Sequence, residues 1–196
     1  MSPSNKGQKL PGEILSQPEV TLLLEACGRH KTGLRNRAAI ILMVRAGLRC
    51  AEALSVRRCD FTVDDGKAVV RILQPKGAGG GKQPRVVGLR ADATQVIQDW
   101  LDVRDAPATT ALCCSRNGRR VLTTYMRALL PRLARKAGID HRVHPHALRH
   151  TWAHTASMGG MPMPVISRAL GHTSLTVTAT YLAHIAPLDV VSAMQE

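Results

Sequence analysis

The chain has 196 residues, enough for one domain with a substantial buried core, and 27 Lys and Arg against 14 Asp and Glu give it a formal net charge of +13. Charge of that sign favours a polyanionic partner such as nucleic acid, with which association would be steered electrostatically and weakened by salt. No stretch approaches the roughly 20 consecutive apolar residues of a membrane span, and five cysteines without a Cys-x-x-Cys pair favour a reduced, cytoplasmic protein over a disulfide-linked secreted one.

In chain order, the sequence predicts a mainly helical α+β fold with a small antiparallel β-sheet. A polar, flexible lead-in occupies residues 1–13, and Ser16 and Glu19 form a capping box that opens the first helix. Alternating apolar residues on either side of a glycine-rich loop, which carries Lys76 and Lys82, predict a β-hairpin. The predicted helices are 16–27, 34–45, 51–54, 92–103, 123–137 with a break or kink at Pro131, 148–158, 164–170 and 174–184, and the strands are 67–73 and 85–89.

Residues suited to chemistry on a phosphodiester are concentrated in the last third of the chain. His146 lies three residues before Arg149, His172 follows Leu-Gly, and Tyr181 follows nine residues later. A tyrosine hydroxyl has an ordinary pKa of about 10, so it becomes a nucleophile only beside a proton acceptor and positive charge. Arginine matches phosphate with its planar fork, and histidine donates to phosphate or relays a proton. Taken alone, Tyr181 also fits a half-buried helix tyrosine.

Two further groups suited to the same chemistry lie upstream. Arg49 supplies a second guanidinium, and Glu52 stands three residues after it. Lys76 or Lys82, on the flexible glycine-rich loop, can reach a leaving 5′ oxygen as general acid. Each of these residues has an ordinary structural alternative, since Arg49 and Glu52 also suit a surface ion pair at i, i+3 and the lysines suit solvated loop positions.

Together these motifs resemble the catalytic domain of the tyrosine recombinases, the phage-integrase and Xer group. The first arginine box of that family matches residues 46–54, its H-x-L-R-H box matches residues 146–150, and its L-G-H box matches residues 170–172. By this resemblance the catalytic residues are Arg49, Lys76, His146, Arg149, His172 and the nucleophile Tyr181, with Glu52 and His150 in support and Lys82 as the alternative general acid.

The resemblance implies a site-specific DNA recombinase or integrase that cleaves and rejoins strands through a 3′-phosphotyrosyl intermediate. It implies no metal, nucleotide or other cofactor, because the covalent bond to Tyr181 stores the energy of the broken phosphodiester. The implied partners are double-stranded DNA, further copies of the chain in a homotetramer on paired sites, and an accessory DNA-binding protein, with no membrane. A nucleoid-associated place in the cytoplasm follows from these partners.

The chain departs from the common family pattern in two places. Residues 14–196 correspond to the catalytic domain, so the sequence predicts no N-terminal core-binding domain, which most members of the family carry. The second departure is the glycine extension of the lysine loop, which leaves the choice between Lys76 and Lys82 open.

Three other functions fit parts of the sequence. A zinc site would use His150 and His154 at i, i+4, but the pair lacks the Glu of His-Glu-x-x-His and the adjacent Cys113 and Cys114 lack ligand spacing. A type IB topoisomerase-like enzyme would use the same nucleophile and cations. A non-catalytic or regulatory DNA-binding relative would occupy sites without cutting, and a dispensable second tyrosine, Tyr125, provides an internal control for that hypothesis.

Overall fold

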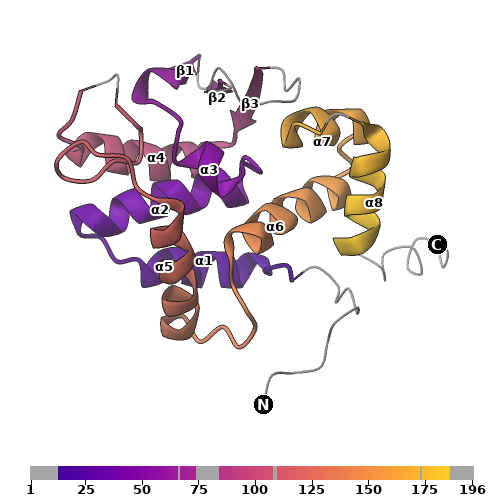
Figure 1. Cartoon of the computed structure of the whole chain (residues 1–196), viewed down its shortest axis with the longest axis horizontal. Helices are drawn as coiled ribbons and strands as arrows, with labels where there is room; N and C mark the ends of the chain where they lie inside the picture. The colour runs from indigo at the N-terminus through magenta and orange to yellow at the C-terminus, as the bar shows by residue number, and fades with distance from the viewer. Residues whose placement is uncertain (1–12, 66, 74–83, 108–109, 173, 186–196) are drawn as a thin grey trace.

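Helices make up most of the molecule, and a three-stranded antiparallel sheet lies along one edge (Figure 1). The structure is a computed structural model that describes residues 13–65, 67–73, 84–107, 110–172 and 174–185, with only the backbone of residues 181 and 183–185. The elements are, in chain order, α1 (Gln17–Ala26), α2 (Lys31–Val44), α3 (Cys50–Ala53), the 3-10 turn η1 (Arg58–Asp60), β1 (Phe61–Asp64), β2 (Lys67–Ile72), β3 (Arg85–Leu89), α4 (Ala91–Val103), α5 (Thr123–Lys136), α6 (Pro145–Met158), α7 (Met163–Leu170) and α8 (Leu175–Ile185).

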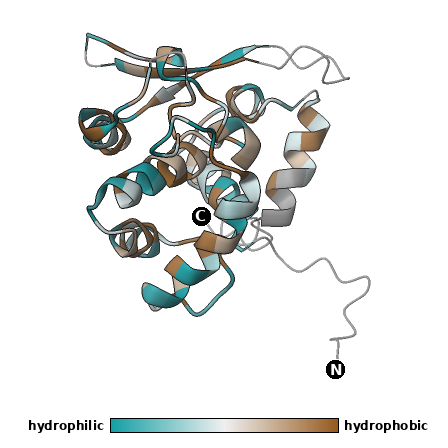
Figure 2. Cartoon of the chain, turned by 60° about the vertical axis from the view of Figure 1, so that its left-hand side comes forward, coloured by the Kyte–Doolittle hydropathy of each residue, from teal (hydrophilic) through white to brown (hydrophobic). Residues whose placement is uncertain are grey.

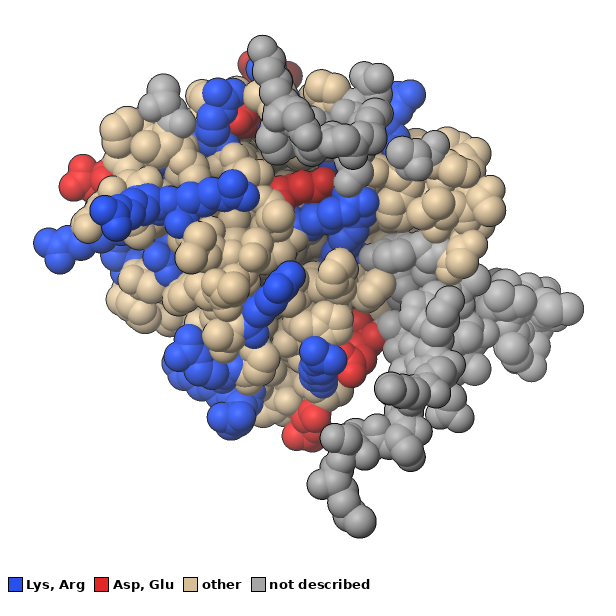
Figure 3. All heavy atoms as spheres, viewed as in Figure 1, with Lys and Arg blue, Asp and Glu red and all other residues tan. Residues whose placement is uncertain are grey.

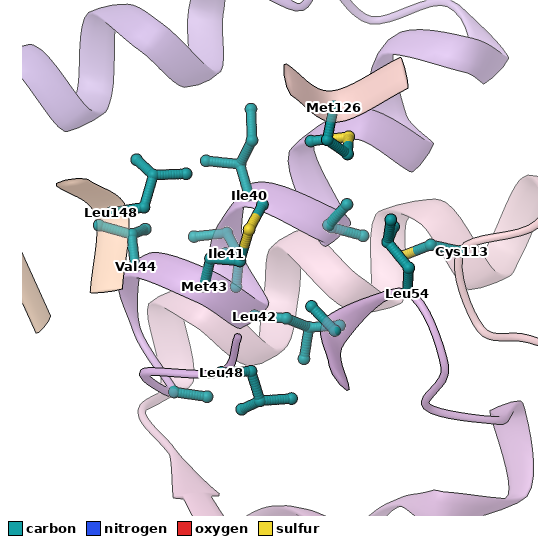
Figure 4. Packing of buried hydrophobic residues seen from close by; sticks show 14 of the residues in the cluster. Ile40, Ile41, Leu42, Met43, Val44, Leu48, Leu54, Cys113, Met126 and Leu148 are labelled. Carbon is teal, nitrogen blue, oxygen red and sulfur yellow. The ribbon is translucent and has the colours of Figure 1, made fainter. Parts of the chain in front are cut away.

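Helix α2 forms the centre of the hydrophobic core. Its residues from Ala38 to Val44 are all buried, and a helix that is apolar on every side must be surrounded by other elements. The surrounding elements include α4 and α6, and Figure 4 shows side chains from α2 meeting Leu54, Met126 and Leu148. The outer helices instead carry hydrophobic and hydrophilic residues on different sides of the same ribbon (Figure 2). The main core cluster therefore extends from Leu15 to Leu148, and a second, smaller cluster consists of Trp152, Ala153, Ile166 and Leu170.

The sheet has strand order β1-β2-β3, and both pairs are antiparallel. Val70 of β2 lies opposite Phe61 of β1 and Val87 of β3, and all three are buried. The hairpin of β2 and β3 confirms the prediction, whereas β1 was not predicted. Its four residues end at Asp64, and the next residue, Asp65, turns the chain with φ of +45°. A strand this short shows too little alternation to be recognised from sequence.

Helix boundaries differ from the predictions mainly at N-termini. Helix α1 has the predicted capping box, in which the Ser16 hydroxyl accepts from the Glu19 N–H. Helix α6 begins three residues before the predicted start, because Pro145 occupies its first turn and the His144 side chain accepts from the Ala147 N–H as N-cap. Of the predicted break or kink at Pro131, the break was wrong, since α5 runs through this residue without interruption.

The early start of α6 matters for function, because it places His146 on the first turn of the helix rather than on the preceding loop. The lead-in 1–13, apart from Glu13, and the glycine-rich loop with Lys76 and Lys82 lie outside the described residues. Within the ranges that are described, no helix has the length and apolar composition that crossing a membrane would require.

Candidate active site

Arg49 is held at the N-terminus of α3 by the acid that follows it. Arg49 is the N-cap residue, with extended backbone, and its N–H donates to a Glu52 carboxylate oxygen at 2.8 Å. Its guanidinium also binds Glu52, with 3.0 Å between Nη1 and Oε1. Glu52 therefore fixes both the backbone and the side chain of Arg49. From sequence, this i, i+3 ion pair could also have been an ordinary surface pair without a catalytic role. The structure places the pair at the candidate site.

Arg149 reaches the same region from the second turn of α6. Its side chain is only 4% exposed, and Nη1 donates to the Gly47 carbonyl at 2.7 Å. Gly47 has φ of +65°, and an added Cβ would lie 2.5 Å from Cε3 of Trp152. A glycine is therefore required at position 47 for two reasons, backbone conformation and space. The glycine of the AGLR segment thus brings the main chain within reach of Arg149.

The Leu-Gly-His segment forms the C-terminal turn of α7. Gly171 takes the left-handed conformation with φ of +64°, and the His172 N–H donates to the Ser167 carbonyl at 3.1 Å. This bond runs back across the helix end, as in the turn by which many helices end at glycine. The geometry places His172 directly after the turn. The L-G-H motif is therefore a helix terminator that positions an imidazole.

Three arginines meet the carbonyl groups at this end of α7. The Leu170 carbonyl accepts from Arg49 Nη1 at 3.2 Å and from Arg149 Nη2 at 2.7 Å, and the Ala169 carbonyl accepts from Arg85 Nε at 2.8 Å. The last carbonyls of a helix lack intrahelical donors and carry partial negative charge, which suits guanidinium groups. The end of α7 therefore gathers cations from β3, α3 and α6 in one place.

His172 lies between Arg149 and α8. Arg149 Nη2 is 3.3 Å from His172 Nε2, and His172 Nδ1 is 2.9 Å from the buried Thr178 hydroxyl. A guanidinium can only donate, so Nε2 accepts and the proton of the neutral ring is assigned to Nδ1. Burial, followed by the charges of Arg149, Arg49 and Arg85, lowers the pKa of His172 to about 4. The imidazole is therefore neutral at physiological pH.

His146 lies at the exposed edge of the site on the first turn of α6. Burial, and then the charges of Arg149, Arg127 and Arg49, lower its pKa below the ordinary value. The His150 ring lies one turn further on, with 6.4 Å between the two ring centroids. Burial, and then the neighbouring arginines, thus favour the neutral form of both rings, and a neutral imidazole is the form that can accept a proton.

Arg85 is a site residue that sequence reasoning missed. It begins β3, is buried, and binds both oxygens of Glu52, at 3.2 Å from Nη1 to Oε1 and 2.8 Å from Nη2 to Oε2. Burial tends to raise the pKa of Glu52, but the hydrogen bond and charge of Arg85, with those of Arg49, outweigh it and hold the pKa below the ordinary value. A signal was present in the sequence, because strand alternation places Arg85 on the same face as the buried Val87.

Tyr181 lies on α8, which packs against α6 and α7. The hydrogen bond from Thr178 to His172 ties the same helix to the arginine cluster. The side chain of Tyr181 and the whole of the loop with Lys76 and Lys82 lie outside the described residues. The structure therefore brings together five of the predicted residues, which are Arg49, Glu52, His146, Arg149 and His172, and places the backbone of Tyr181 on a helix in contact with theirs.

Basic side chains surround the site as well as forming it. Figure 3 shows Lys and Arg spread over the face seen in Figure 1, with few Asp and Glu among them. Arg120 donates to the Ala51 carbonyl at 3.0 Å, next to the arginine box, and Arg127 projects from α5. The charges of Arg120 and Arg127 both act on Cys50, and that of Arg127 also acts on His146. The surroundings of the site therefore suit an extended polyanion.

Comparisons with known proteins agree on one family. The sequence model of the phage integrase family matches residues 13–186. The tyrosine recombinase XerD of Corynebacterium glutamicum is 32% identical over 190 residues, which cover 92% of this chain and 60% of that protein. The tyrosine recombinase XerC of Chlamydia pneumoniae is 31% identical over 184 residues, covering 89% of this chain and 56% of that protein. This chain thus spans little more than half the length of these relatives.

Solved structures show the same fold. The crystal structure of XerA recombinase superimposes with a TM-score of 0.77 at 25% identity, over 93% of this chain and 65% of that one. The XerH site-specific recombinase, bound to its difH substrate in a pre-cleavage complex, gives a TM-score of 0.72 at 26% identity, over 95% of this chain and 53% of that one. The catalytic domain of bacteriophage HP1 integrase shares the fold at 22% identity and a TM-score of 0.57.

Proposed function

This chain belongs to the phage integrase family, and from that premise we propose that it is a site-specific recombinase that cleaves and rejoins double-stranded DNA through a phosphotyrosyl intermediate. The observation that carries the proposal is the convergence of Arg49, Arg149 and His172 on the end of α7, where Leu170 accepts from both guanidiniums. Two fixed guanidinium forks beside an imidazole suit a tetrahedral phosphate whose negative charge grows in the transition state.

In the proposed reaction, the Tyr181 oxygen attacks the scissile phosphorus and the bond to the 5′ oxygen breaks. Arg49 and Arg149 bind the non-bridging oxygens, and Lys76, with Lys82 as the alternative, protonates the leaving 5′ oxygen. The tyrosine proton passes to His146, whose ring is in the neutral, proton-accepting form, whereas Nε2 of His172 already accepts from Arg149. A 5′ hydroxyl of a partner strand then attacks the phosphotyrosine, restores a phosphodiester and releases the Tyr181 hydroxyl. One phosphodiester is thereby exchanged for another, so no external energy source is needed.

The proposed partner is DNA, with four copies of the chain acting on paired sites, an accessory DNA-binding protein in addition, and the nucleoid as the place of action. Arg120 and Arg127 would contact phosphates next to the scissile one, since both are exposed and neither forms an ion pair within the described part of the chain. Such contacts position a duplex without reading its sequence.

Replacing either Arg120 or Arg127 with Gln is expected to weaken DNA binding to a similar degree on all duplex sequences. Each loss of a phosphate contact should reduce the slope of log affinity against log salt by about 1. Fluorescence anisotropy of a labelled duplex over a salt series measures both quantities. Arg29→Gln is the matched control, because Arg29 precedes α2, whose 14 residues place it roughly 20 Å from the arginine box. An unchanged salt slope in both variants would contradict the assignment.

Lys76→Ala is expected to slow DNA cleavage far more than Lys82→Ala, because the proposal assigns Lys76 the general-acid role. The comparison uses two duplexes, one with an ordinary 5′ oxygen and one with a 5′ sulfur at the scissile bond. A thiolate leaves with little protonation, so the sulfur substrate should restore cleavage by Lys76→Ala. Absence of rescue would show that Lys76 is not the acid, and the reverse order of the two variants would assign the role to Lys82.

A further inference from the structure

The guanidinium of Arg85 binds both oxygens of Glu52, which sets it apart from Arg49 and Arg149. Its side chain is 5% exposed, close to the 4% of Arg149, whereas that of Arg49 is 31% exposed. We propose that Arg85 is a positioning residue for strand cleavage, which balances the charge of Glu52 and fixes the turn that carries His172. This inference rests on the proposed function, because it assigns a role within the same site.

The first part of the role is electrostatic. Glu52 is needed to hold Arg49, but its carboxylate also lies 3.9 Å from Arg149 Nη1. Without a third cation, that carboxylate would neutralise charge that Arg49 and Arg149 present to phosphate. Arg85 binds both Glu52 oxygens from the buried side. The negative charge of the carboxylate is therefore balanced by a guanidinium that does not bind the substrate. The cluster of three arginines and one glutamate then keeps its excess positive charge for the phosphate.

The second part of the role is geometric. Arg85 Nε donates to the Ala169 carbonyl, and its guanidinium lies under Gly171. A Cβ added at Gly171 would lie 2.9 Å from Arg85 Nη1 and 3.0 Å from Cζ, so the glycine turn and the guanidinium are fitted to each other. His172 is the next residue along the chain. Any displacement of Arg85 would therefore move the turn on which the His172 backbone depends.

The position of Arg85 in the chain adds a link to the lysine loop. Arg85 is the first residue of β3 and follows the 74–83 loop after a single proline. Its three hydrogen bonds join the base of that loop to α3 through Glu52 and to α7 through Ala169. One side chain thus connects the strand after the general-acid loop with the elements that carry Arg49 and His172.

The test compares wild type, Arg85→Met, Arg85→Lys and Glu52→Gln/Arg85→Met in single-turnover cleavage of a nicked duplex at saturating protein. Arg85→Met should cleave about 10-fold to 100-fold more slowly than wild type, the usual loss when a residue that orients site groups is removed. Arg85→Lys should recover part of that loss, because it restores the positive charge but not the planar guanidinium with its paired donors. Duplex affinity should stay within about threefold, because Arg85 does not touch the DNA.

Two comparisons separate this role from a general loss of structure. A methylphosphonate at the scissile position removes one negative charge, so the defect of Arg85→Met should shrink on that substrate. In the Glu52→Gln background, loss of Arg85 should cost less than it does in the wild type, because no carboxylate remains to be balanced and only the geometric part of the role is lost. Arg90→Met, five residues along the chain at an exposed position, is the matched control and should cleave like wild type.

Each outcome decides between the inference and its alternatives. Equal defects on phosphate and methylphosphonate, or additive defects with Glu52→Gln, would overturn the charge-balancing role. If Arg85→Met does not fold, the same two comparisons are made with Arg85→Gln, which also removes the charge. A wild-type rate in Arg85→Lys on the phosphate substrate would overturn the requirement for the planar guanidinium. Failure of the wild-type protein to form any covalent product on its duplexes would instead contradict the proposed function itself.

Discussion

Tyr181→Phe will bind duplex DNA as wild type does and will form no covalent protein–DNA adduct. The phenolic oxygen is the proposed nucleophile, and its removal leaves no atom to attack phosphorus, so cleavage should fall by at least about 10⁴-fold. The measurement is a denaturing gel of labelled, nicked duplex after incubation with each protein. Anisotropy on the same duplex shows that binding is retained.

Tyr125→Phe is the matched control for this prediction, since it removes the same atom from the other tyrosine of the chain. The Tyr125 hydroxyl contacts Asn36, whose Nδ2 donates to it at 3.1 Å, and the Arg35 guanidinium lies over its ring. Its loss should lower the free energy of unfolding by about 1 kcal/mol and leave cleavage intact. Adduct formation that survives in Tyr181→Phe but is lost in Tyr125→Phe would reverse the assignment.

Arg149→Lys is expected to slow cleavage by about 10³-fold, although it keeps the positive charge. The guanidinium binds the Gly47 and Leu170 carbonyls and approaches His172, and one ammonium cannot reproduce that planar set of donors. Single-turnover cleavage measures the effect. Duplex affinity should change only a few-fold, because many phosphate contacts remain.

The control for Arg149→Lys is Arg168→Lys, an exposed arginine in the last turn of α7 that should cleave at the wild-type rate. Thermal unfolding of both variants distinguishes a catalytic loss from a loss of structure, since Arg149 is buried. A cleavage rate for Arg149→Lys within about threefold of wild type would show that the fork geometry of Arg149 is not needed for the reaction.

The elements with strong local signals were the ones predicted from the sequence. The Ser16 and Glu19 capping box and the two alternating strands of the hairpin lie where local rules place them. The start of α6 was missed because histidine is an unusual N-cap and its role is visible only in the bond from the Ala147 N–H to His144. A break or kink of α5 was predicted at Pro131 because this one residue was considered without the tertiary packing of its neighbours Leu130 and Leu133.

The candidate site was predicted as a set of residues but not as a geometry. Motif spacing identified Arg49, Arg149 and His172, and in the motifs of Arg49 and His172 a required glycine stands close to the functional side chain. Spacing could not show that Arg49 and Arg149 share the Leu170 carbonyl, since that contact spans more than a hundred residues in one case. Arg85 was missed for the same reason, because its partner Glu52 lies 33 residues away.

The proposed covalent bond to Tyr181 is tested most directly by trapping. Nicked suicide duplexes tiled across the DNA that flanks the gene are incubated with the wild-type protein, and adducts that survive a denaturing gel are digested for mass spectrometry. We predict one modified peptide, with a nucleotide joined through phosphate to the Tyr181 oxygen. Tight duplex binding with no adduct on any duplex, or an adduct on another residue, would contradict the account.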